Sequence, residues 1–177
     1  MELRSWHRIV LAPTGAFFEA LLDFAVARRG HYPLFSLVQR RQKPATGAGA
    51  ELLAALEPYL VTTAGTGKLQ PLQHPDDAPQ NPEKPAPSKG PPSGSFAAAT
   101  ERIHFYRLER SAAAVLVRAG GLESFVAPLP EDLCVLASDK TPWLQSEARA
   151  GRYRLQLTAE EHKAIAKALP WLQLAAG

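Results

Sequence analysis

Residues 152–170 read RYRLQLTAEEHKAIAKALP and predict a strand that leads directly into a capped helix. Polar and apolar side chains alternate over residues 152–157, which is typical of a strand with one buried face. Thr158 and Glu161 then match the T-x-x-E capping box, in which each side chain bonds the backbone N–H of the other residue. Apolar residues follow at helical spacing until Pro170, where we expect the helix to end.

The sequence before this stretch predicts further antiparallel strands. Residues 133–137 (LCVLA) are apolar without alternation, as expected of a central strand. Residues 143–147 and 152–157 would continue from it as a meander. Residues 103–108 and 113–118 are also rich in strand-forming side chains, and we interpret them as the two strands of a hairpin.

The N-terminal part has a different order of elements. Residues 6–11 predict a strand, residues 15–29 a largely buried helix, and residues 34–41 a second strand. Short joints between them favour a βαβ unit. A helix over residues 49–56 and a strand over residues 59–63 complete this part.

A proline-rich stretch separates the two parts. Eight of the 16 prolines of the 177-residue chain fall between residues 71 and 94, and proline removes the backbone donors that a helix or sheet needs. We therefore predict an α+β fold with an N-terminal part (1–69), a flexible linker or insertion (70–95) and a C-terminal part (96–177). The two parts are small enough that they could also pack as one domain.

Motifs for phosphate and dinucleotide binding are incomplete. The run Gly65 to Lys68 is followed by Leu69, whereas a Walker A loop needs serine or threonine there to hold magnesium. Gly47 and Gly49 begin a dinucleotide fingerprint, but Leu52 stands where its third glycine is required. The five histidines form no metal-binding spacing, so we predict no metal site. Because the other motifs are incomplete, we also predict no cofactor and no catalytic residue.

The cysteine content and hydropathy bear on location. Cys134 is the single cysteine and lies in an apolar run, which favours an inert thiol in the core. One cysteine allows no internal disulfide and agrees with a reducing compartment. The most apolar stretch, residues 9–26, contains Glu19 and Asp23 and is not an uncharged membrane span. We expect a cytoplasmic protein that does not act in a membrane.

Arginines supply the candidate binding residues. Arg40 and Arg41 end the second predicted strand, while Arg152 and Arg154 occupy the polar positions of the strand quoted above. Arginine is enriched at the energetically dominant positions of protein interfaces. The net charge of +3 is too small to indicate binding to nucleic acid by charge alone.

These observations favour a non-enzymatic protein that binds another protein: a small accessory subunit or an immunity-like binder. The alternative is an accessory factor that binds nucleic acid through its arginine faces. A third hypothesis is an enzyme whose site is assembled from both parts of the chain.

Overall fold

The structure, a computed structural model, describes residues 3–28, 30–40, 47–65 and 101–177. The predicted linker (70–95) and Arg41 lie outside the described residues. Within these ranges, no helix has both the length and the apolar character needed to cross a membrane.

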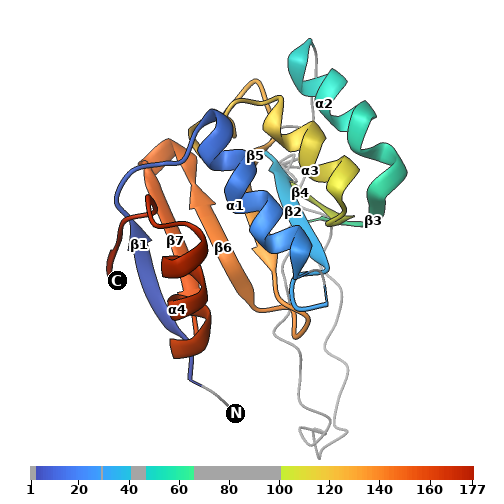
Figure 1. The fold of residues 1–177 in the computed structure, drawn as a ribbon. Coiled ribbons are helices and arrows are strands. Elements are labelled where there is room, and N and C mark those ends of the chain that lie inside the picture. Colours follow the sequence, from blue (N-terminus) through green and yellow to red (C-terminus); the bar gives the residue numbers. More distant parts are fainter. Residues whose placement is uncertain (1–2, 29, 41–46, 66–100) are drawn as a thin grey trace, which may run out of the picture.

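The described residues form one eight-stranded sheet whose neighbouring strands are all antiparallel, in the order β3-β4-β2-β5-β6-β7-β1-β8 (Figure 1). The strands are β1 (Ser5–Ile9), β2 (Leu34–Gln39), β3 (Leu60–Gly65), β4 (Arg102–Arg107), β5 (Glu131–Leu136), β6 (Pro142–Glu147), β7 (Arg152–Leu157) and β8 (Leu174–Ala176). The helices are α1 (Gly15–Ala27), α2 (Ala48–Leu56), α3 (Arg110–Val117) and α4 (Ala159–Ala168), with short 3-10 turns η1 (Glu57–Tyr59), η2 (Leu122–Ser124) and η3 (Ala148–Ala150). The α+β prediction is confirmed.

The N-terminal part begins as a βαβ-like unit, but its two strands are not neighbours. Four successive antiparallel pairs lead from β1 through β7, β6 and β5 to β2, so β1 and β2 run in the same direction. The meander of β5, β6 and β7 fills the space between them. Because β2 lies between β4 and β5, strands from both parts of the chain share one sheet.

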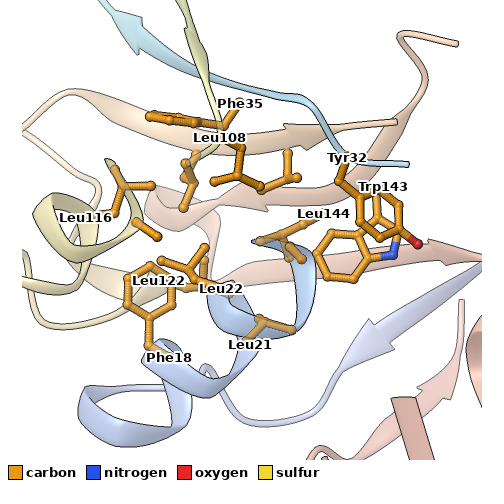
Figure 2. Close-up of a cluster of buried hydrophobic side chains, with 14 of the residues drawn as sticks. Phe18, Leu21, Leu22, Tyr32, Phe35, Leu108, Leu116, Leu122, Trp143 and Leu144 are labelled. Carbon is orange, nitrogen blue, oxygen red and sulfur yellow. The ribbon is translucent and has the colours of Figure 1, made fainter. Parts of the chain in front are cut away.

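The hydrophobic core lies between this sheet and the described helices, which cover one of its faces (Figure 1). Helix α1 contributes Phe18, Leu21 and Leu22, all fully buried (Figure 2). An irregularity between β5 and β6 interrupts the alternation of side chains near Trp143. The Trp143 ring is fully buried against that of Tyr32, with 4.5 Å between the ring centroids. The core therefore ties the first helix to the central strands.

The prediction of a strand over residues 113–118 was wrong, because α3 occupies this segment. Ala112, Ala113 and Leu116 are buried and follow one another at helical spacing, and α3 packs against α1. The alanine-rich sequence favours a helix, and this packing outweighs the β-propensity of the valines. Strand β8 was not predicted, because its Leu-Ala-Ala sequence has neither alternation nor β-branched residues.

The capping box at the start of α4 is confirmed. The Glu161 backbone N–H donates to the Thr158 hydroxyl oxygen (3.1 Å), and the Thr158 N–H donates to the Glu161 carboxylate (2.8 Å). The same carboxylate accepts a hydrogen bond from the Tyr32 hydroxyl at 2.6 Å and pairs with Arg4 at 3.1 Å. Glu161 therefore connects the start of α4 to two distant segments.

Two histidines meet where α4 covers β1. The ring centroids of His7 and His162 are 4.9 Å apart. Burial, and then the charge of His162, lower the pKa of His7 from its ordinary value of 6.5. The contact therefore favours the neutral form of His7.

Replacement of Thr158 by alanine tests the cap. Thr158→Ala removes the acceptor for the Glu161 N–H and should lower the free energy of unfolding by about 1 kcal/mol. Thr158→Ser keeps a hydroxyl and is the matched control. Urea denaturation measures both variants, and equal stability of Thr158→Ala and the wild type would contradict a stabilising role for the cap.

The histidine contact predicts a pH dependence of stability. Unfolded His7, with its ordinary pKa of 6.5, takes up a proton that the folded ring resists. The contribution of neutral His7 to the free energy of unfolding is therefore complete above pH 6.5. It is lost as the pH falls from 6.5 toward the lowered pKa of the folded protein. His7→Gln should flatten this part of a urea-denaturation series between about pH 5 and 8. His104→Gln is measured beside it, because burial also lowers the pKa of His104. An unchanged pH profile for His7→Gln would show that His7 contributes nothing.

Candidate functional site

The face of the sheet opposite the described helices carries the predicted Arg40, Arg152 and Arg154, and we call it the open face. Burial alternates along β7, and the less buried set consists of Arg152, Arg154 and Gln156. The other set enters the core and consists of Tyr153, Leu155 and Leu157. The predicted orientation of this strand is therefore confirmed.

A row of polar side chains crosses the middle of the open face. The strand register places Ser36 of β2 opposite Cys134 of β5, and Cys134 opposite Gln145 of β6. Gln145 in turn lies opposite Arg154 of β7. Four adjacent strands therefore present one continuous polar row, which sequence spacing alone could not reveal.

A hollow of about 490 Å³ lies over this row. Ser36, Cys134 and Gln145 line it together with apolar side chains of β2 and β4. Charged residues also line it, and they come from three separate segments: Arg40, Asp132, Glu147 and Arg149. The hollow is therefore lined both by Arg40 and by Glu147, the carboxylate that binds the two arginines of β7.

Ion pairs join the charged residues around the hollow into two sets, one around Arg40 and Glu131 and one around Glu147, which together we call the arginine–carboxylate network. Its members are Arg40, Arg149, Arg152, Arg154, Glu101, Glu131, Asp132 and Glu147. Arg40 pairs with Glu101 (3.2 Å), Glu131 (3.0 Å) and Asp132. The hydrogen bond to Asp132 is the main cause that raises the pKa of Arg40. This arginine is therefore held by three carboxylates.

Glu131 is the buried member of the set around Arg40, with only 4% of its side chain exposed. It binds Arg149 of η3 at 2.7 Å in addition to Arg40. The adjacent Asp132 has a left-handed backbone (φ +53°) beside a bulge between β2 and β5. Neighbouring side chains on a regular strand point to opposite faces, and this irregularity allows both Glu131 and Asp132 to reach Arg40.

Glu147 holds the two arginines of β7. It pairs with Arg154 at 2.7 Å and also with Arg152, across the turn between β6 and β7. The Arg154 guanidinium also lies 5.1 Å from the ring centroid of Trp6 on β1, within range of a cation–π contact. Arg152 is the outermost of the pair, with 64% of its side chain exposed.

Three of the four predicted arginines thus lie on one face, and Arg41 lies outside the described residues. Sequence reasoning missed their carboxylate partners. Glu131 and Asp132 are adjacent in the sequence, but nothing in their spacing connects them to Arg40. The closeness of Glu147 to Arg152 in sequence, across a strand turn, was a usable signal.

Cys134 does not lie in the core as predicted, because it is partly exposed on the open face. Burial nevertheless raises the pKa of its thiol to about 12, and a hydrogen bond with Ser36 opposes this shift only in part. The thiolate is the nucleophilic form of cysteine, so the thiol is poorly suited to nucleophilic catalysis at neutral pH. Across the described ranges, no group of three or more His, Cys, Asp or Glu side chains could hold a metal ion.

Comparisons with known proteins give no family or relative. No protein-family model matches the chain, and neither a curated protein nor a solved structure matches it.

The raised pKa of Cys134 predicts slow labelling. At neutral pH, maleimide should modify the native protein at least about tenfold more slowly than the urea-unfolded protein, because little thiolate is present in the folded state. Mass spectrometry over time measures both rates, and Cys134→Ser controls for modification elsewhere. Equal rates in the native and unfolded proteins would contradict a protected thiol.

Proposed function

We propose that this chain is a non-enzymatic protein of the cytoplasm that binds another protein through the open face of its sheet. One observation carries the proposal: the arginine–carboxylate network surrounds a hollow on a sheet face that the described helices leave uncovered. Its charged groups come from both parts of the chain and are held in place by one another. Because these groups are already ordered before binding, less conformational entropy is lost when a partner binds.

The side chains on this face suit a protein interface. Interfaces are enriched in arginine and aromatic residues that combine apolar contact area with hydrogen bonds. Trp6 and Arg154 supply such a pair, and the adjacent Arg152 has donor groups that reach solvent. Because Glu147 orients both arginines, less side-chain freedom is lost when they contact a partner.

The balance of charge favours a protein over nucleic acid. The network contains four arginines and four carboxylates. Nucleic-acid binding depends on a surplus of positive charge that displaces counterions from phosphates. Carboxylates beside each arginine reduce that surplus and would repel a phosphate backbone. A protein with both acidic and basic side chains can match this alternating pattern.

Arg152→Glu tests the proposal with a small structural change. Arg152 is the outermost member, whereas Arg154 also contacts Gln145 and Trp6, so its replacement would disturb the folded face. Arg118→Glu is the matched control, because Arg118 is exposed just after α3 and undergoes the same change of charge. We expect Arg152→Glu to weaken a co-purified protein complex by more than about 2 kcal/mol, the usual threshold for a hot spot, while Arg118→Glu binds normally.

Affinity purification from the cells that naturally produce the protein, followed by titration with the recovered partner, makes this measurement. Unchanged affinity for Arg152→Glu would contradict binding at this face. Recovery that disappears after nuclease treatment, with a steep dependence on salt, would instead support the nucleic-acid alternative.

A further inference from the structure

A second surface lies where the chain passes from β1 into α1. Three large apolar side chains are exposed there: Leu11 by 73%, Phe17 by 53% and Val10 by 46%. Trp171 joins them from the segment after α4, with its ring centroid 4.8 Å from that of Phe17. We call these four residues the apolar patch.

The patch includes a preformed pocket of about 240 Å³. Leu11, Pro13, Phe17 and Trp171 line it, and Gln173 supplies a polar side chain. Pockets for small molecules usually measure roughly 300–1,000 Å³, so this pocket is better matched to one large side chain.

The loop that carries the patch is firmly held. The Gly15 N–H donates to the Gly120 carbonyl oxygen (2.7 Å), and the Leu122 N–H donates to that of Pro13 (3.2 Å). A Cβ atom at Gly121 would lie 2.9 Å from the Pro13 carbonyl oxygen, so only glycine fits this approach. Exposed apolar side chains on a fixed loop form a defined surface.

An edge of the sheet adjoins the pocket, because Gln173 lines the pocket and directly precedes β8. β8 is the last strand of the sheet and lies beside β1 near the C-terminal end (Figure 1). The Gln173 carbonyl oxygen accepts from the Val10 N–H (3.0 Å), and the Gly177 N–H donates to the Trp6 carbonyl oxygen (3.1 Å). Alternate residues of an antiparallel strand face the same neighbour, so the backbone groups of Leu174 and Ala176 point away from β1.

The size of the patch distinguishes between occupants. The exposed parts of Val10, Leu11 and Phe17 amount to roughly 300 Å² of apolar surface, the size of a functional patch but well below the roughly 800 Å² per partner of a stable dimer. A short peptide that adds a strand to an edge needs no larger surface, because backbone hydrogen bonds supply much of the affinity.

We propose that β8 and the apolar patch together bind an extended peptide segment of another protein, which adds a strand beside β8 and inserts a large apolar side chain into the pocket. Arg8 is exposed on β1 opposite Ala175 and has no ion pair within the described residues. Side chains of a strand alternate between faces, so an acidic residue next to the apolar anchor would reach Arg8. Arg8 lies opposite Arg154 of β7, but the pocket shares no residue with the open-face hollow, so either proposal can fail while the other holds.

Selection of a phage-displayed library of random linear peptides on the full chain tests the proposal. We expect enriched sequences that contain Phe, Leu or Trp next to Asp or Glu. A synthetic, fluorescein-labelled peptide of the enriched sequence then measures affinity by anisotropy. Failure to enrich such a sequence would overturn the proposal.

Matched variants locate the bound peptide. Phe17→Glu should weaken binding at least tenfold while the protein remains folded, because a carboxylate in the first turn of α1 is favourable to the helix dipole. Val61→Glu places the same charge on a 51% exposed apolar residue of β3 and should bind normally. Equal loss in both variants would contradict binding at the patch.

Backbone pairing has its own tests. Ala176→Pro removes an outward N–H but leaves the bonds between β8 and β1, so it should reduce peptide binding at least tenfold without unfolding the protein. N-methylation of the peptide should abolish binding at one set of alternate positions and spare the other set. Equal tolerance of all positions would overturn strand addition, as would dimerisation of the free chain that Phe17→Glu abolishes.

Discussion

The Glu161 carboxylate is the interaction on which the arrangement of the chain depends most. It caps α4 through the Thr158 N–H and accepts a 2.6 Å hydrogen bond from the Tyr32 hydroxyl. Its pairing with Arg4 adds the segment before β1. Tyr32 is fully buried beside Trp143, so loss of the carboxylate would leave a hydroxyl without its acceptor in the core. Such a loss costs more than the net gain from making the bond, since desolvation is no longer offset.

This connection allows strands from distant parts of the sequence to share one sheet. Helix α1 must cross β7, β6 and β5 between β1 and β2, and the Tyr32 turn fixes the place where the chain enters β2. Both surfaces follow from that path. The open-face hollow needs β2 beside β5, because it lies over Ser36 and Cys134, and the β8 edge exists because β1 lies beyond β7.

The sequence predicted elements whose signal is local. The Thr158–Glu161 cap and the alternation along β7 depend on neighbouring residues, and both were correct. Residues 113–118 were assigned wrongly because their helix is stabilised by packing against α1, which local propensity does not report. The site was harder still. Arg40 and Asp132 are 92 positions apart, and a left-handed backbone and a bulge contribute to their contact. Periodicity contains no information about either irregularity.

The two surfaces differ in the physical basis of recognition. On the open face, each arginine of the network already has a carboxylate partner, so a bound protein must replace or extend existing ion pairs, and the net gain depends on geometry more than on charge. At the β8 edge, the outward backbone groups and the exposed Leu11 have no such competing partners within the described residues. Binding there replaces water alone, so a few contacts suffice for a short peptide. One fold can therefore combine a selective polar face with a permissive apolar edge, because the hollow and the apolar pocket have no lining residue in common.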